Sequence, residues 1–226
     1  MRSFAAEAGS PGQSYPRYRP QEEIADRCIH LFGVGLGIGA ALVLIGLAAG
    51  RGDAAIILAV AIYVVGLVAM LTCSALYNLT PPSARKEALR RFDHAAIFVM
   101  IAGSYTPFLL GRMGGAWGWG LLGFVWLTAA AGASLALAAP HRFERLQLAG
   151  YLLLGWSILV AREPLTASVP AAAIWLLVAG GLLYSFGVLF HLWRRLAFHN
   201  AIWHGLVLAA AGCHYAAVLL GVVLAG

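Results

Sequence analysis

The chain is poor in charged residues and contains no long polar segment. Only 11% of its 226 residues are Asp, Glu, Lys or Arg, whereas 62% are hydrophobic and the mean hydropathy is +0.84. A soluble domain has roughly 25% charged and 45–50% apolar residues. The composition therefore predicts an all-α membrane protein that crosses the bilayer several times. Because no polar segment is long enough to fold separately, we expect one helix bundle in one domain.

Cysteine is also scarce, and this excludes two kinds of small-domain scaffold. Cys28, Cys73 and Cys213 are far apart and form no CxxC motif, so neither a disulfide framework nor a structural zinc knuckle is indicated. The N-terminal stretch has no apolar run of signal-peptide length before its prolines. We expect residues 1–21 to form a disordered cytoplasmic tail, followed by a transmembrane domain over residues 22–226.

Seven stretches of the chain are long and apolar enough to cross a membrane as helices, which takes about 20 residues each. Short polar or Pro/Gly-rich breaks separate them. The fifth is the weakest, because it has only about 16 strongly apolar residues before Arg162 and Pro164. The sequence predicts a seven-transmembrane bundle with spans at 24–49, 54–78, 92–111, 117–139, 146–161, 171–192 and 200–224.

The basic residues are distributed asymmetrically between the two ends of this predicted bundle. Twelve of the 15 fall on the side of the N-terminus, and three, Arg51, Arg112 and Arg162, fall on the other. By the positive-inside rule the N-terminus is cytoplasmic and the C-terminus outside. The same asymmetry explains the net charge of +6, so we expect no nucleic-acid partner. The expected location is the bacterial inner (plasma) membrane, with membrane lipids as partners.

Polar residues near the ends of the predicted helices gather on the cytoplasmic side. Ionisable groups cost at least about 2.5 kcal/mol each at the centre of a spanning helix, so by default they have a functional or paired role. The third span carries Asp93 and His94 at its start, directly after Arg90 and Arg91. The other polar residues on this side are His30, Ser74, Asn78, His191, His199, Asn200 and His204.

Helical spacing arranges several of these residues around one point. Ser74 and Asn78 share a helix face at i, i+4, and so do Asn200 and His204. This spacing allows a single focus with Asp93 at the inner ends of the second, third and seventh helices. A simpler interpretation is that Asp93 caps the third helix and pairs with a neighbouring arginine.

Two other histidines and a glycine series receive structural interpretations. His94 lies about 100° around the helix from Asp93, so we expect it to support the site from outside. His214 is deeper in the bundle and is expected to be hydrogen-bonded within the membrane. The glycines at positions 33, 35, 37 and 39 predict close helix packing of the small-xxx-small kind rather than a phosphate-binding loop.

Three strings carry a family resemblance: SALYN at 74–78, RFDHAAIFVMIAGSYTPFLL at 91–110 and NAIWHGLVLAAAGCHYAAV at 200–218. Together they resemble the haemolysin III family, within the wider seven-helix group of progestin and adiponectin receptors. That resemblance implies a zinc ion near the cytoplasmic face. It would be held by a histidine ending helix two in an S-x-x-x-H pattern and by two histidines in an H-x-x-x-H pattern on helix seven, with an aspartate of helix three holding the metal-bound water.

The chain departs from that pattern at two positions. Ser74, Asp93 and His204 match the family's residues, whereas Asn78 and Asn200 stand where two of the three zinc-binding histidines would be. An amide oxygen is a poor substitute for imidazole, so the departures argue against a tightly bound zinc. Asp93 could bind a metal directly, together with His204 and with help from His199, His94 or His30. The alternative is a metal-free hydrogen-bond network of the two asparagines with Asp93 and His204.

Three functional hypotheses follow. The preferred one is a haemolysin III-like membrane protein of lipid homeostasis or lytic activity, with a degenerate metal site. The second is a zinc-dependent intramembrane hydrolase of lipid amide or ester bonds, in which Asp93 and Ser74 are the catalytic candidates. The third is a transporter or channel in which Asp93 and His204 form a proton-linked pair.

Overall fold

The protein is a bundle of helices in the computed structural model, which describes residues 18–139 and 142–225. Within these two ranges, seven helical stretches are long and apolar enough to cross a membrane, as predicted. The expected N-terminal tail lies almost wholly outside the described residues. The helices are α1 (Pro20–Arg51), α2 (Ala54–Leu79), α3 (Ala84–Phe108), α4 (Gly115–Ala138), α5 (Glu144–Trp156), α6 (Arg162–Ser168), α7 (Ala171–Leu192) and α8 (His199–Val218).

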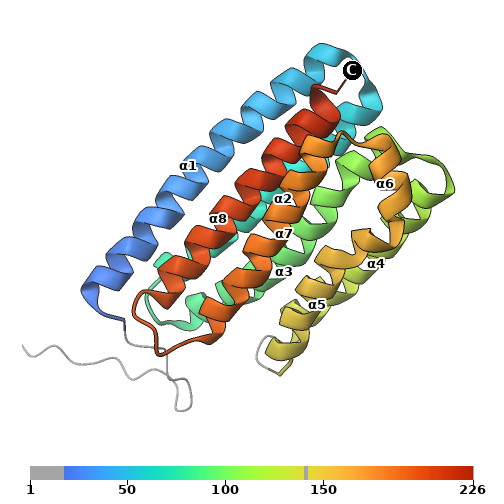
Figure 1. Cartoon of the computed structure of the whole chain (residues 1–226). Helices are drawn as coiled ribbons and strands as arrows, with labels where there is room; N and C mark the ends of the chain where they lie inside the picture. The colour runs from blue at the N-terminus through green and yellow to red at the C-terminus, as the bar shows by residue number, and fades with distance from the viewer. Residues whose placement is uncertain (1–17, 140–141, 226) are drawn as a thin grey trace, which may run out of the picture.

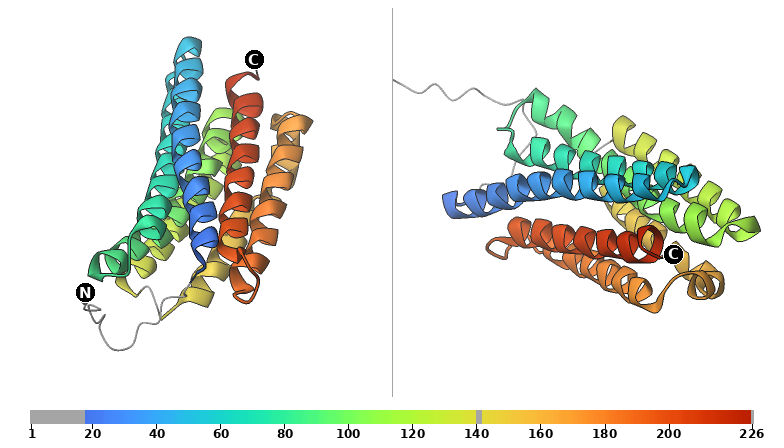
Figure 2. Two further views of the ribbon diagram at one scale, coloured as in Figure 1. Left: turned by 90° about the vertical axis from the view of Figure 1, so that its left-hand side faces the viewer. Right: turned by 90° about the horizontal axis from the view of Figure 1, so that it is seen from above.

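The first and last spanning helices are neighbours in the bundle. α1 packs against α2 and also against α8, which in turn lies along α7 (Figures 1 and 2). The start of α1 and the end of α8 lie at opposite ends of the bundle, as an odd number of spans requires (Figure 1). The predicted orientation, with the N-terminus in the cytoplasm, stays a prediction. All three cysteines are free thiols.

The fifth span is interrupted, in keeping with its weak apolar run. α5 ends at Trp156, a 3-10 segment follows over Ser157–Ala161, and α6 completes the span. Tyr105 of α3 stabilises this interruption. Its hydroxyl donates to the carbonyls at the end of α5, with oxygen-to-oxygen distances of 2.8 Å to Leu154 and 2.7 Å to Gly155, and it accepts from the Ile158 amide at 3.0 Å. One side chain thus satisfies backbone groups that the helix break exposes.

The third helix begins well before its predicted start at residue 92. Ser83 caps it, with its Oγ accepting from the amide of Lys86 at 3.2 Å. Lys86 then reaches back and donates from Nζ to the carbonyls of Tyr77 at 2.9 Å and Thr80 at 2.8 Å, at the end of α2. Asp93 therefore lies inside α3, and its interpretation as an N-terminal cap is wrong. Hydropathy missed this first part of the helix because it is polar and held by side-chain hydrogen bonds.

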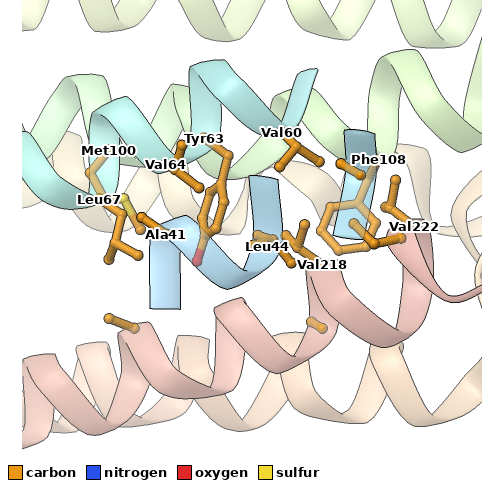
Figure 3. Packing of buried hydrophobic residues seen from close by; sticks show 14 of the residues in the cluster. Ala41, Leu44, Val60, Tyr63, Val64, Leu67, Met100, Phe108, Val218 and Val222 are labelled. Atoms are coloured by element: carbon orange, nitrogen blue, oxygen red, sulfur yellow. The ribbon is translucent and has the colours of Figure 1, made fainter. Parts of the chain in front are cut away.

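The apolar core occupies the half of the bundle away from the start of α1. It is formed by residues such as Leu44, Val60, Tyr63, Val218 and Val222, all of which are fully buried (Figure 3). The opposite half, near the start of α1, contains most of the buried charged side chains of the described residues. The fold therefore separates an apolar half from a half in which polar chemistry is concentrated.

The glycine series on α1 has only one packed face. Gly33 and Gly37 are buried, and a Cβ at either would contact Leu71 of α2; one at Gly33 would also lie 3.4 Å from Leu208 of α8. Gly35 and Gly39 face away from the bundle with nothing nearby. The expectation of close packing is therefore correct for the first pair and wrong for the second, because only one face of α1 meets its neighbours.

Candidate metal centre

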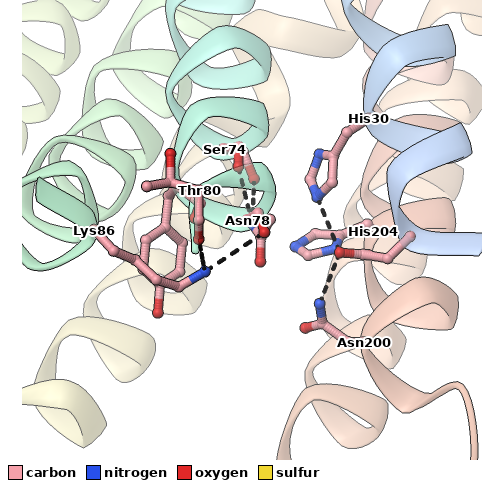
Figure 4. A network of polar contacts seen from close by, with 9 residues as sticks. His30, Ser74, Asn78, Thr80, Lys86, Asn200 and His204 are labelled. Carbon is pink, nitrogen blue, oxygen red and sulfur yellow. Dashed lines mark hydrogen bonds and ion pairs between the residues drawn. The ribbon is translucent and has the colours of Figure 1, made fainter. Parts of the chain in front are cut away.

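A buried group of Asp26, His30 and His204 lies at the end of the bundle where α1 begins. One potential ligand atom from each residue lies within 4.8 Å of the others. His204 Nδ1 donates to Asp26 Oδ1 at 2.6 Å, and His30 Nε2 lies 3.5 Å from Asp26 Oδ2. The two imidazole rings are 4.3 Å apart between centroids. Figure 4 shows His30 and His204 directed toward each other from α1 and α8.

Local helix geometry and helix packing together build this group. Asp26 and His30 are four residues apart on α1 and so share its inner face. That face approaches α8 at Gly33, where the absence of a Cβ leaves room for Leu208. Glu22, one turn earlier, anchors the junction: its Oε1 accepts from the amide of Phe198, just before α8, at 3.0 Å.

Asn200 belongs to the same group as a hydrogen-bond donor. Its Nδ2 donates to Asp26 Oδ2 at 3.1 Å, one helical turn before His204 on α8. The resemblance places a zinc-binding histidine at this position. In this chain the amide instead holds one oxygen of Asp26, while His204 binds the other. Asn200 therefore orients a carboxylate that α1 supplies.

Asn78 lies in a different set of contacts, on the opposite side of the interior from His204 (Figure 4). Its Nδ2 donates to the carbonyl of Ser74 at 2.9 Å and is 3.4 Å from the Ser74 hydroxyl, so the amide is turned back onto its own helix. The expected single network of Asp93, His204 and the two asparagines is therefore wrong, because its central carboxylate is not Asp93. The carboxylate that binds Asn200 and His204 is Asp26, because α8 packs beside α1.

Asp93 is buried on α3 and faces the same interior space. The Ser74 hydroxyl is its hydrogen-bond partner, and His30 is among its charged neighbours. Of the two arginines expected to pair with it, Arg90 forms an ion pair with Glu144 at the start of α5 and is also among the charged neighbours of Asp93. Asp93 is not one of the three clustered ligand residues, so its role as a metal ligand or catalytic residue stays a prediction.

The remaining histidines of the sequence-based prediction lie around the site rather than in it. His94 Nδ1 is 3.0 Å from Gln147 Oε1 on α5, in keeping with a supporting position. His191 packs against Trp203, and His199 packs against Tyr18. His214 donates from Nδ1 to the carbonyl of Ala210 at 3.0 Å, as expected of a hydrogen-bonded histidine within the membrane.

A cavity adjoins the candidate metal centre and continues into the bundle. Its volume is about 160 Å³, counted as the space open to the centre of a water-sized sphere. His30 and His204 line it at one end together with Ser74 and Asp93. Most of its remaining wall is apolar and comes from α2, α3, α5, α7 and α8, including Leu71, Met100, Ile101, Leu152 and Leu208.

The donor set of the group fits a divalent metal ion such as zinc. Two imidazoles and one carboxylate are a known ligand set of catalytic zinc sites, with metal–ligand distances of about 2.0–2.2 Å, so that ligand atoms lie roughly 3.3 Å apart. The 3.5 Å between His30 Nε2 and Asp26 Oδ2 matches this spacing, and His30 Nε2 has no hydrogen-bond partner among the described residues. The 2.6 Å between Asp26 and His204 would have to widen slightly.

Sequence reasoning missed Asp26, although a signal was present. The predicted first span began at residue 24, so Asp26 fell at a membrane edge, where a charged residue is ordinary. Its i, i+4 spacing to His30 was visible in the sequence. What the sequence did not show is that this face of α1 would meet His204.

Comparison with known proteins places the chain in a family. Residues 18–215 match the family model described as haemolysin-III related. A "Hemolysin-3 homolog" of Bacillus subtilis (strain 168) is 40% identical over 199 residues, covering 88% of this chain and 93% of the relative. "Hemolysin-3" of Bacillus cereus is 37% identical over 203 residues, covering 90% and 93%. The human "Monocyte to macrophage differentiation factor" is 31% identical over 169 residues, covering 70% and 67%.

No solved structure matches the chain. The family match covers most of the chain and includes all three residues of the candidate metal centre. With seven candidate spanning helices among the described residues and two bacterial relatives aligned over 93% of their length, the protein is an integral membrane protein that belongs to the haemolysin III-related family.

Proposed function

We propose that the protein acts in membrane-lipid homeostasis by taking a membrane amphiphile into its central cavity, with the head group at Asp26, His30 and His204, the residues that would hold a zinc ion. One observation carries the proposal: His30 and His204 belong both to the group of potential metal ligands and to the lining of the cavity. An apolar cavity with a few convergent polar groups at one end is the usual form of a ligand site.

The apolar wall and the polar end of the cavity have different roles in this proposal. The apolar wall formed by residues such as Met100 and Leu208 accepts an acyl chain. The polar end, lined by His30, Ser74, Asp93 and His204, orients a head group, and Asp26 holds the His204 ring in place. Zinc in this position would supply a Lewis acid that binds head-group oxygens. We place this site at the cytoplasmic side of a bacterial plasma membrane, following the distribution of basic residues.

Hydrolysis of a lipid amide or ester is a second candidate, and the position of Asp93 favours it. Asp93 and Ser74 line the same end of the cavity as His30 and His204. A buried carboxylate facing a metal-binding group can accept a proton from an attacking water, and Ser74 is placed to hold the carboxylate's orientation. Under this hypothesis Asp93 is the general base and not a metal ligand.

Metal analysis of the purified full-length protein tests the main proposal. After growth with added zinc, we expect about one zinc per chain, lost in His204→Ala because a ligand is removed. The matched control is His191→Ala, which removes a histidine that packs on Trp203 outside the ligand group and should keep the zinc. Wild-type protein without zinc, or His204→Ala with full zinc, would contradict the metal part of the proposal.

Mass spectrometry of lipids that copurify tests the cavity. Leu208→Trp narrows the cavity and should reduce the bound amphiphile several-fold, whereas Leu220→Trp, at an exposed position of the last span, should leave it unchanged. Equal lipid content in both variants would argue against occupation of the cavity.

For the hydrolase hypothesis, Asp93→Asn should abolish cleavage of a fluorogenic acyl amide or ester while zinc content stays the same. Unchanged cleavage in that variant would exclude Asp93 as the base.

A further inference from the structure

The cavity has a second polar end, formed by Tyr184 of α7 and His214 of α8. Both residues line the cavity that His30 and His204 also line. His204 and His214 are ten residues apart on α8, which corresponds to ~15 Å along the helix axis at about 1.5 Å per residue. The second polar end therefore lies deep in the membrane-spanning part of the bundle, separated from the metal centre by apolar wall.

The hydroxyl group of Tyr184 is buried and has no hydrogen-bond partner among the residues that the structure describes. A buried donor without a partner is costly, and the surrounding bilayer offers no water to replace one. Unsatisfied buried polar groups of this kind are uncommon in proteins and call for an explanation. A polar group on a bound molecule in the cavity would provide the missing partner.

His214 supplies the complementary hydrogen-bonding atom next to Tyr184. Its Nδ1 donates to the carbonyl of Ala210 at 3.0 Å, which leaves Nε2 of the neutral ring as an acceptor. The rings of Tyr184 and His214 are 5.5 Å apart between centroids. Gly180 makes room for the imidazole, since a Cβ at that position would lie 2.5 Å from His214 Nδ1. The pair thus offers one hydrogen-bond donor and one acceptor in the lining of the same cavity.

We propose that Tyr184 and His214 form a subsite for a hydroxyl group on the acyl chain of the bound amphiphile. A hydroxyl matches the pair because it accepts from the phenol of Tyr184 and donates to Nε2 of His214. A plain acyl chain leaves both atoms unpaired, and a carbonyl satisfies only the donor. This inference rests on the proposed binding of an amphiphile in the cavity and specifies its chemical class as a hydroxylated acyl chain.

The distance between the two polar ends selects the probe. An extended chain advances roughly 1.25 Å per bond when its C–C bonds are ~1.5 Å long. The 12 bonds from the carboxyl carbon to the terminal oxygen of 12-hydroxydodecanoate therefore span about 15 Å. The carboxylate of this probe would occupy the metal centre, and its hydroxyl would reach Tyr184 and His214. Dodecanoate is the matched probe without the hydroxyl.

The test is a calorimetric titration of the full-length protein in phospholipid nanodiscs with both probes. We expect the wild-type protein to bind 12-hydroxydodecanoate roughly 3- to 10-fold more tightly than dodecanoate, the range expected from one net hydrogen bond. Tyr184→Phe should reduce this preference, because only the bond to His214 remains, and leave the affinity for dodecanoate unchanged. Tyr151→Phe is the matched control: Tyr151 also lines the cavity, but its hydroxyl donates to the carbonyl of His94, so the preference should persist.

A second comparison needs no variant and keeps the inference testable if Tyr184→Phe does not fold. Between 8-hydroxyoctanoate and octanoate, which are too short to reach the second polar end, we expect no preference. Equal affinity of the wild type for the two twelve-carbon probes, or a preference of undiminished size in Tyr184→Phe, would overturn the hydroxyl subsite while leaving amphiphile binding intact. Failure of both twelve-carbon probes to bind would overturn the proposed function and this subsite together.

Discussion

Replacing Asp26 by asparagine tests the centre of the site most directly. The substitution keeps the size of the side chain but removes the charge that accepts from Asn200 at 3.1 Å and from His204 at 2.6 Å. Hydrogen bonds to charged groups contribute about 1.5–3 kcal/mol each and neutral ones about 0.5–1.5 kcal/mol. Weakening two such bonds should lower the free energy of unfolding by about 1–3 kcal/mol, the lower end being typical of side-chain bonds within membranes.

The assay is thermal unfolding followed by tryptophan fluorescence, with and without zinc. For a chain of this size each kcal/mol shifts the midpoint by roughly 2–4 °C, so metal-free Asp26→Asn should unfold several degrees below wild type. Zinc at about 100 times its Kd should stabilise the wild type by about 2.7 kcal/mol and the variant far less. Asp53→Asn is the control, because Asp53 caps α2 away from the site and asparagine caps a helix equally well. A zinc response in Asp26→Asn equal to that of the wild type would refute the reasoning.

Three further predictions concern packing, the broken helix and the family pattern. Gly132→Ala places a methyl group against a buried phenyl ring of α3 and should lower the free energy of unfolding by about 1–3 kcal/mol. Gly123→Ala on the same helix, in open space, should leave that free energy unchanged or raise it by up to ~1 kcal/mol. Equal midpoints of the two variants in thermal unfolding would contradict this. Tyr105→Phe should cost about 1–3 kcal/mol in the same assay, because the break after α5 loses its hydrogen bonds, and a wild-type midpoint would show that they are dispensable. Asn200→His places an imidazole beside Asp26, one turn before His204, and should raise zinc affinity on the order of tenfold or more, measured by competition with a chelating dye. Unchanged affinity would mean that this position does not reach a bound metal.

Most of the architecture was predictable from the sequence because its causes are local. A stretch of about 20 apolar residues must form a helix in a bilayer, whatever its neighbours are, and all seven predicted spans are present. The weak fifth span is interrupted over Ser157–Ala161, just before the point where Arg162 and Pro164 end its apolar run. The start of the third helix was misplaced because polar helix turns held by Ser83 and Lys86 carry no hydropathy signal.

The sequence by itself determined which residues carry the chemistry on each helix, and the tertiary structure decided which of them meet. His204, Asn200 and the i, i+4 pair of Asp26 and His30 are fixed by position in the chain. Periodicity cannot say which face of a helix that is apolar on all sides points inward, so nothing in the sequence chose between Asp26 and Asp93 as the partner of His204. The packing of α8 beside α1 made that choice, because the side chains of two helices meet only where their facing surfaces leave room.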